Sequence, residues 1–220
     1  MKRIPEAERM DQPVAADAYA RADFADVNTR FVEDVAQALA GLSPKRLLDL
    51  GSGPGDIPIT LARAQVAPMV VAVDAASAML KWASRRIATH LSGGPIALVQ
   101  ADAKVLPFGD GAFDAIVSNS ILHHVADPHL FWCEVRRLLA PRGRIFMRDL
   151  KRPDSIADAH AFVDEYARDE SDELQGEFFR SLCAAYTLDE VREQLRAGGL
   201  ASLDVSVSSD RHLDVVGVAI

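Results

Sequence analysis

The chain has 220 residues, of which 49% are apolar and 25% are charged, and this composition excludes a disordered or fibrous protein. Its 24 basic and 32 acidic residues leave a net charge of −8, which argues against a nucleic-acid-binding protein, because neutralising phosphates requires a basic surface. No apolar stretch is long enough to cross a membrane, and the first residues lack the apolar core of a secretory signal, so we expect a cytoplasmic protein.

The first 44 residues predict a helical cap that precedes the core of the fold. The first dozen residues are polar and predict a loose arm. Apolar residues then recur at helical spacing between positions 14 and 40, and we expect a break near Asp26–Asn28.

Residues 45–150 alternate between short apolar runs and helical stretches, which predicts strands connected by helices. The predicted strands are residues 46–50, 69–74, 96–100, 113–118 and 144–150, and the predicted helices are residues 56–65, 76–90 and 128–139. Pro141–Gly143 predicts a tight turn before the fifth strand. Because the runs are apolar throughout, we expect a parallel sheet with helices on both faces.

The last third of the chain predicts a lid and the end of the same sheet. Residues 151–186 are helical and acidic, and we expect them to form a lid insertion. Residues 187–220 predict a helix followed by strands at 200–208 and 213–220, which are joined by a hairpin, so the sheet should end with an antiparallel strand. The helix carries Thr187 as its N-cap and Glu190 in the capping-box position. The whole chain is therefore predicted as one domain, and Cys133 and Cys183 as free thiols.

A glycine-rich loop is the most informative segment. Gly51, Gly53 and Gly55 follow a predicted strand and precede a helix, which lets the backbone turn sharply and lets a ligand approach closely. Asp74 ends the next strand, 23 residues after Gly51, where its carboxylate can accept hydrogen bonds from ribose hydroxyls. This combination predicts a site for a cofactor that contains adenosine.

The acidic residues of the loop distinguish between cofactors. A dinucleotide-binding loop has a third glycine where this chain has Asp56, and Asp49 adds a second negative charge that would repel a pyrophosphate. A sulfonium cofactor with an amino group tolerates such neighbours better. No Gly-Lys-Ser/Thr follows the loop, which excludes a P-loop.

Four segments carry a family resemblance: LLDLGSGPGD, VVAVDAASAML, QADAKVLPFGDGAFDAIVSNSILHHVADP and LLAPRGRIFM. Together they resemble class I S-adenosylmethionine-dependent methyltransferases, especially the small-molecule branch that includes ubiquinone and menaquinone C-methyltransferases. The resemblance implies a Rossmann-like α/β sandwich of three layers, with a seven-stranded, mostly parallel sheet in the order 3-2-1-4-5-7-6 and strand 7 antiparallel. It also implies transfer of the methyl group of S-adenosylmethionine to an oxygen, nitrogen or carbon of an unidentified small molecule.

The resemblance assigns cofactor contacts to individual residues. Asp74 would bind the ribose, Asp102 and the backbone of Ala103 the adenine edge, and Met79 the adenine face. Asp102 as a turn residue and Met79 as a core residue are the alternatives. The remaining implied cofactor residues are Asp49, Gly51, Ser52, Gly53, Ala75 and Asn119, together with Tyr19, which could reach the cofactor carboxylate or simply pack the cap.

The reacting side should lie beyond the strand ends. His123 and His124 are interpreted as locally packed residues, as a base or substrate contact, or as metal ligands, and we predict no metal because no third ligand follows at a recognisable spacing. We expect His124 and Asp149 to act in catalysis and His123 to contact the substrate. Arg148 and Lys151 would bind a polar group of the substrate, the alternative being a salt-bridged strand end.

Two other functions remain open from the sequence. One is a regulatory or assembly protein that binds S-adenosylmethionine without transferring its methyl group. The other is a nucleic-acid methyltransferase, which the net charge of −8 disfavours, as does the absence of an Asn-Pro-Pro-Tyr motif, because Asn119 is followed by Ser120 and Ile121. We expect a small-molecule substrate, neither a membrane nor a nucleic-acid partner, and leave a homodimer open.

Overall fold

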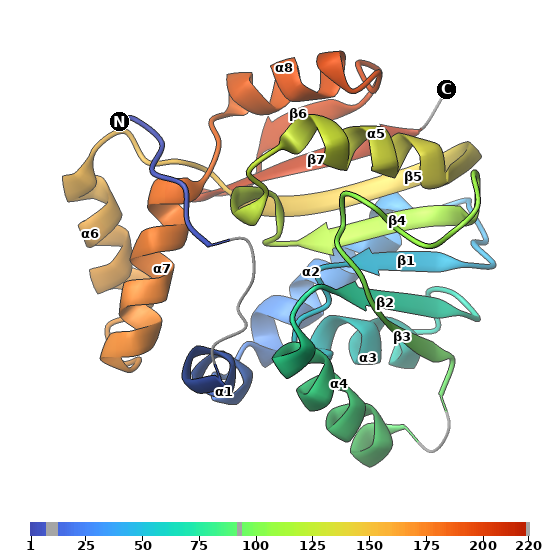
Figure 1. Cartoon of the computed structure of the whole chain (residues 1–220), viewed down its shortest axis with the longest axis horizontal. Coiled ribbons are helices and arrows are strands. Elements are labelled where there is room, and N and C mark those ends of the chain that lie inside the picture. Colours follow the sequence, from blue (N-terminus) through green and yellow to red (C-terminus); the bar gives the residue numbers. More distant parts are fainter. Residues whose placement is uncertain (8–12, 92–93, 219–220) are drawn as a thin grey trace.

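The computed structural model describes residues 1–7, 13–91 and 94–218, and its centre is one twisted sheet (Figure 1). Its strands are β1 (Leu47–Leu50), β2 (Val70–Asp74), β3 (Ile96–Gln100), β4 (Phe113–Asn119), β5 (Leu139–Leu150), β6 (Asp204–Val207) and β7 (His212–Val218). They form a seven-stranded sheet in the order β3-β2-β1-β4-β5-β7-β6. Strands β1 to β5 pair in parallel, whereas β7 is antiparallel to both β5 and β6, which confirms the predicted fold class.

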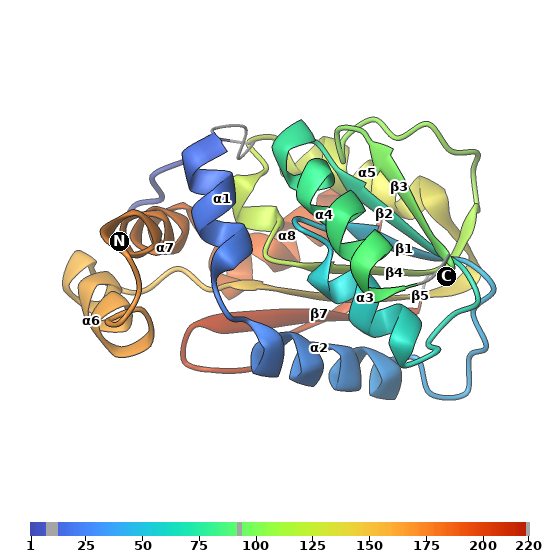
Figure 2. The same cartoon turned by 90° about the horizontal axis from the view of Figure 1, so that it is seen from below.

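Helices cover both faces of the sheet. They are α1 (Pro13–Arg21), α2 (Ala25–Ala38), α3 (Asp56–Arg63), α4 (Ser77–His90), α5 (Pro128–Leu138), α6 (Ile156–Tyr166), α7 (Asp172–Ala184) and α8 (Leu188–Ala197), and a short 3-10 helix, η1, spans Leu122–His124. Helices α2, α3 and α4 lie on one face and α5 and α8 on the other. Helices α1, α6 and α7 lie beyond the carboxyl ends of the parallel strands (Figure 2). None of the helices in the described parts of the chain is long and apolar enough to cross a membrane.

The two faces of the sheet hold separate apolar clusters. On one face, Phe131 and Trp132 of α5 pack with Ile116 of β4, and all three side chains are fully buried. On the other face, Phe31 of α2 packs with Phe146 of β5, the ring centroids being 5.4 Å apart. Each large side chain buried in this way contributes about 1.5–3 kcal/mol to stability, so the sheet rigidly positions the loops at its ends.

The helix ends follow the predicted local chemistry. The Thr187 hydroxyl accepts a hydrogen bond from the Glu190 amide, and the Glu190 carboxylate accepts one from the Thr187 amide, so the capping box is confirmed. Cys133 and Cys183 are both free thiols, as expected. The antiparallel pairing of β6 with β7 confirms the hairpin.

Three predicted boundaries were wrong. Pro141–Gly143 does not form a separate turn but belongs to β5, where the register with β4 shifts and Arg142 has a φ of +63°, as in a β-bulge. The break in the cap falls between α1 and α2, because the Asp23 carboxylate accepts a hydrogen bond from the Ala25 amide at 3.0 Å and starts α2 there. Strand β6 begins at Asp204 and is shorter than predicted, and the last two residues of the predicted final strand lie outside the described residues.

The predicted loose arm is also corrected, because residues 1–7 pack against the molecule. The Arg3 guanidinium donates to the backbone carbonyls of Ala184 at 2.6 Å and His123 at 2.9 Å, and it stacks 4.0 Å from the centroid of the Tyr186 ring. The Ile4 amide donates to the Cys183 carbonyl at 2.9 Å. This segment therefore lies across the end of α7 and beside η1, while residues 8–12 of the predicted arm lie outside the described residues.

Candidate functional site

The glycine loop after β1 is tied to the end of β2. The amides of Gly51 and Ser52 both donate to the Val73 carbonyl at 2.9 Å, and the Gly53 amide donates to the Asp74 carboxylate at 2.8 Å. The second oxygen of that carboxylate accepts from the Ala76 amide at 2.8 Å. The structure therefore brings Asp74 beside the glycine loop, as predicted.

The glycines of the loop have different neighbours. Gly53 has a φ of +53°, and a Cβ added there would have no heavy atom within 4 Å, so its outer side is open. Gly55 has a φ of +92°, and its Cβ would lie 3.0 Å from the backbone of Ala83 in α4. Gly55 thus permits two helices to approach each other, whereas Gly53 borders free space that a ligand could fill.

Asp49 and Ser52 present buried polar atoms to this loop. Both carboxylate oxygens of Asp49 and the hydroxyl of Ser52 are buried and have no hydrogen-bond partner within the described ranges. Burial, and to a smaller extent the negative charge of Asp74, raise the pKa of Asp49 to about 8. Buried polar groups without partners cost about 1–3 kcal/mol each, so the site suits a ligand that carries hydrogen-bond donors and a positive charge. The amino group and sulfonium of S-adenosylmethionine meet that requirement.

Tyr19 and Met79 pack beside the same edge. Met79 is buried in a small cluster with Ala16 and Ala76, and Tyr19 is partly buried against that cluster, with its ring centroid 5.2 Å from that of Phe24. Burial, followed by the charges of nearby acidic residues, raises the pKa of Tyr19 to about 12, so its hydroxyl remains a hydrogen-bond donor at neutral pH. The predicted contacts of both side chains with the cofactor stay predictions.

The ends of β3 and β4 carry the other predicted cofactor residues. Asp102 is exposed, and its carboxylate accepts a hydrogen bond from the Lys104 amide at 2.9 Å and pairs with the Lys104 ammonium at 3.2 Å, as expected of a turn residue. Ala103 is half-buried beside it, and the Ala75 carbonyl accepts a hydrogen bond from Gln100. Asn119 is the last residue of β4. The adenine and methionine contacts assigned to these residues stay predictions.

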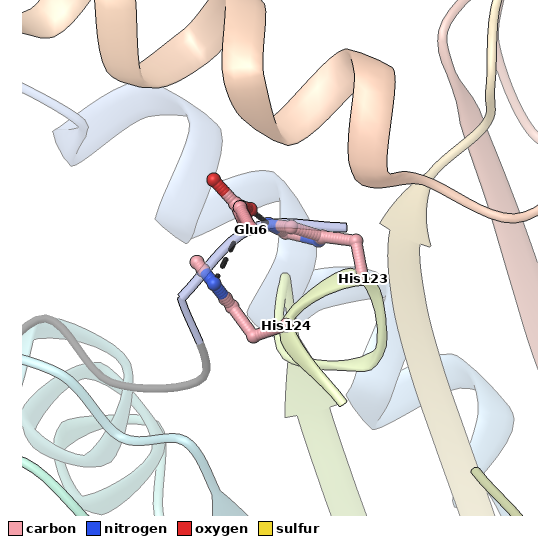
Figure 3. Close-up of side chains that lie close together, drawn as sticks. All are labelled: Glu6, His123 and His124. Carbon is pink, nitrogen blue, oxygen red and sulfur yellow. Dashed lines mark ion pairs between the residues drawn. The ribbon is translucent and has the colours of Figure 1, made fainter. Parts of the chain in front are cut away.

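The two histidines lie against the N-terminal segment (Figure 3). His123 is buried, its Nδ1 lies 2.6 Å from the Asp149 carboxylate, and its Nε2 lies 3.5 Å from Oε1 of Glu6. His124 places its Nδ1 3.2 Å from the same Glu6 oxygen and 3.2 Å from the Ala7 carbonyl. Residues far apart in the sequence therefore converge on one cluster of two imidazoles and two carboxylates.

The cluster gives its two histidines different acidities. Burial lowers the pKa of His123, but the Asp149 carboxylate, its hydrogen bond and the Glu6 charge outweigh this effect and raise it. Burial and the neighbouring His123 lower the pKa of His124 to about 3. His124 is therefore neutral at physiological pH and a weak base, so its predicted catalytic role requires activation from a neighbouring group.

The predicted substrate residues on β5 are engaged within the protein. The Arg148 guanidinium pairs with both oxygens of Asp214, at 2.8 and 2.6 Å, and with Asp34 at 3.0 Å. Arg148 therefore forms the salt-bridged strand end that was the alternative to a free anion-binding group. Asp149 accepts hydrogen bonds from the Leu122 and Leu150 amides as well as from His123, so it positions the loop after β4. Both side chains therefore have internal partners, and the predicted substrate contact of Arg148 and the predicted catalytic role of Asp149 stay predictions.

Some residues of the site were not predicted. Glu6 lies in the predicted loose arm, where its acidic side chain is the only sequence signal that could have indicated a functional residue. Ser120 has a φ of +60° and donates its amide to the Arg148 carbonyl at 2.9 Å, a strained backbone of the kind found at functional sites, and no sequence signal marks it. Lys151 contributes backbone contacts to Arg211 and Tyr186, and its predicted substrate contact stays a prediction.

Comparison with known proteins identifies a methyltransferase domain in the middle of the chain. A family model described as a methyltransferase domain matches residues 48–147. The demethylmenaquinone methyltransferase of Thermus thermophilus is 37% identical over 111 residues, which cover 50% of this chain and 50% of that protein. Residues 48–147 belong to the class I S-adenosylmethionine-dependent methyltransferases.

Solved structures extend the likeness beyond this methyltransferase domain. A SAM-dependent methyltransferase from Aquifex aeolicus superposes with a TM-score of 0.69 at 18% identity and covers 95% of this chain and 99% of its own. The plantazolicin methyltransferase BpumL, solved in complex with SAH and a monoazolic desmethylPZN analog, has a TM-score of 0.74 at 14% identity, and the match covers 96% of this chain and 90% of that one. At such identities the likeness shows the fold. The chain spans about half the length, or less, of the first curated relatives it matches.

Proposed function

We propose that the chain transfers the methyl group of S-adenosylmethionine to an oxygen, nitrogen or carbon atom of a small molecule. The observation that carries the proposal is the pair of buried, unpartnered polar side chains, Asp49 and Ser52, beside the open side of Gly53. Nothing within the described ranges uses these polar atoms, and a cationic cofactor with an amino group would satisfy them.

The residues around the loop would divide the work of holding the cofactor. Asp49, Ser52 and the backbone at Gly53 would hold its methionine part, and Asp74 would accept hydrogen bonds from the ribose while it keeps the loop in place. Asp102 would bind the adenine edge. When bound, S-adenosylmethionine supplies a methyl group already activated by its sulfonium, so the protein mainly has to orient the acceptor and exclude water.

The acceptor would be chosen by segments outside the core. We assign this selection to residues 1–44 and to the helical lid at 151–186, because α1, α6 and α7 lie beyond the carboxyl ends of the strands, where ligands of open α/β sheets bind. The relatives are named for different acceptors, among them demethylmenaquinone and malonyl-[acyl-carrier protein], so their names do not select one. The net charge of −8 suits a small acceptor better than a nucleic acid.

Calorimetry with S-adenosylmethionine and its demethylated product tests the cofactor step. We expect micromolar binding to the wild type and a loss of about 10- to 100-fold in Asp74→Asn, the size expected when hydrogen bonds to a charged group are lost. Asp204→Asn, on the exposed edge strand β6, is the matched control and should bind normally. A wild-type protein that binds neither compound contradicts the proposal.

Transfer itself needs a second assay. Incubation with cofactor labelled in its methyl group, together with a metabolite extract, should yield a labelled small molecule that Asp74→Asn forms more slowly. Binding without labelled product from any acceptor would favour the regulatory or assembly role. Label in added RNA or DNA would favour a nucleic-acid methyltransferase.

A further inference from the structure

We propose that Glu6, His123 and His124 form a site for a divalent transition-metal ion. One donor atom from each of the three residues lies within 4.8 Å of the donor atoms of the other two. Figure 3 shows the Glu6 carboxylate between the two imidazole rings. The binding of the ion does not depend on the proposed methyl transfer.

The distances between the donor atoms suit an ion. Bonds of about 2.0–2.1 Å in a tetrahedral site separate neighbouring ligand atoms by about 3.3 Å. Oε1 of Glu6 lies 3.5 Å from Nε2 of His123 and 3.2 Å from Nδ1 of His124. Two edges of the tetrahedron are therefore already close to the required length, and binding needs only small rotations of the side chains.

The Glu6 carboxylate is an independent sign that a cation belongs here. Only 7% of its side chain is exposed, and Oε1 has no hydrogen-bond partner within the described ranges although it points between the two rings. Its ion-pair contacts with His123 and His124, at 3.5 and 3.2 Å, do not form hydrogen bonds, and a buried carboxylate oxygen that lacks them is costly, whereas coordination of a metal ion would satisfy it.

His123 is oriented as metal-binding histidines are. Its Nδ1 lies 2.6 Å from the Asp149 carboxylate, which leaves Nε2 directed towards Glu6. A carboxylate that holds the second nitrogen of a ligating histidine fixes the tautomer and makes the ring a better ligand. The Nδ1 of His124 lies 3.2 Å from the Ala7 carbonyl, so an ion would have to replace that contact.

The donor set selects the class of ion. Two imidazoles and one carboxylate suit Zn²⁺ or Fe²⁺ better than Mg²⁺ or Ca²⁺, which prefer oxygen ligands throughout. Three protein ligands leave at least one coordination position open, as in catalytic sites. Ile121, two residues before His123, lies beside Gly51 of the cofactor loop, since a Cβ added to Gly51 would be 2.9 Å from its side chain. The ion would therefore sit on a segment that adjoins the proposed cofactor site, where its open position would be available to an acceptor oxygen. This last step rests on the proposed function.

Titration of the chelator-stripped full chain with Zn²⁺ alone, in competition with a chromophoric chelator and without cofactor, tests the site. We expect one equivalent to bind and to raise the melting temperature, whereas Glu6→Gln, which keeps the side-chain shape, should bind at least about 10-fold more weakly. His124→Asn should weaken binding similarly. Mg²⁺ should not compete.

A second pair of soft ligands provides the control. The Sγ of Cys133 lies 3.7 Å from Nε2 of His129, so a His129→Asn/Cys133→Ser double variant removes an alternative zinc site and should bind zinc as the wild type does. X-ray absorption at the zinc edge should show nitrogen and oxygen neighbours at about 2.0–2.1 Å and no sulfur at about 2.3 Å. The proposal would be overturned if the wild type binds no zinc, or if a folded Glu6→Gln variant binds zinc as tightly as the wild type. Loss of zinc binding in the His129→Asn/Cys133→Ser variant would also overturn it. A failed cofactor titration would leave this result unaffected.

Discussion

His123 and Asp149 connect the loop after β4 to the end of β5 through a contact of 2.6 Å between Nδ1 and Oδ1. Asp149 also accepts hydrogen bonds from the Leu122 amide at 2.6 Å and the Leu150 amide at 2.8 Å, and it is 4% exposed. Because one buried carboxylate holds three donors from two segments, it fixes where the histidine pair lies relative to the sheet. Its role is to position His123.

Replacing Asp149 by alanine should be strongly destabilising. Three buried donors would lose their acceptor, and breaking a buried charged pair typically costs about 3–5 kcal/mol. Urea unfolding followed by circular dichroism measures the change. Asp204→Ala, at an exposed carboxylate, should change the free energy of unfolding by less than about 0.5 kcal/mol. An Asp149→Ala variant as stable as the wild type would contradict this positioning role.

Alanine substitutions at two glycines of the cofactor loop should affect cofactor affinity and protein stability differently. Gly53→Ala places a methyl group in the open space beside Asp74, so we expect cofactor affinity to fall by about 10-fold or more, while strain at positive φ costs only about 1–2 kcal/mol. Gly55→Ala brings a methyl group to within 3.0 Å of the Ala83 backbone, so its main effect should be lost stability, at least about 2 kcal/mol.

Calorimetric titration and urea unfolding of the same two proteins measure both quantities. Gly41→Ala is the matched control, because Gly41 also has a positive φ, of +81°, with nothing within 4 Å of an added Cβ, but lies outside the loop. It should lose stability without losing cofactor affinity. A Gly53→Ala variant that binds cofactor as tightly as Gly41→Ala would refute the predicted contact.

The raised pKa of Asp49 predicts a pH-dependent stability. Its pKa is about 8 in the folded protein and about 3.9 when unfolded, so the folded state binds this proton more tightly in that interval. Stability should therefore fall as the pH rises from about 4 through 8. Asp49→Asn should remove this contribution and be more stable than the wild type above neutral pH, by on the order of 1–3 kcal/mol, with little difference near pH 4. A constant difference across the range would contradict the shift.

The same group predicts that cofactor binding releases a proton. Below about pH 8 Asp49 is protonated in the free protein, and a bound ammonium group would favour the carboxylate, so affinity should rise between pH 6 and 7.5. Calorimetry in buffers of different ionisation enthalpy measures the proton released. Asp49→Asn should bind more weakly, with no such pH dependence. Unchanged proton release in this variant would assign the effect to another group.

Arg148 should act on stability through Asp214. Arg148→Met removes the guanidinium that donates to both carboxylate oxygens of Asp214, a residue that is only 8% exposed. We therefore expect the free energy of unfolding, measured in urea, to fall by about 3 kcal/mol. The double variant Arg148→Met/Asp214→Leu should recover much of that loss. A stable Arg148→Met variant with a raised KM for the acceptor would instead restore the predicted substrate contact.

Much of the fold was predictable because its signals are local. Continuous apolar runs marked the buried parallel strands, and Thr187 and Glu190 marked the start of α8. The boundaries that failed depended on distant contacts. Pro141–Gly143 continues β5 because β4 supplies a pairing edge, and residues 1–7 are held by carbonyls of Ala184 and His123 that no pattern within the segment indicates.

The candidate site divides in the same way. The sequence by itself determined the glycine loop, Asp49 and Asp74, because spacing along a strand-loop-helix unit dictates where those groups meet. Only the tertiary structure decided that Arg148 forms an ion pair with Asp214, and that Glu6 lies against His123, 117 residues away in the sequence, and its neighbour His124. Those contacts depend on how separate segments pack across the end of the sheet, and local periodicity carries no information about such distances.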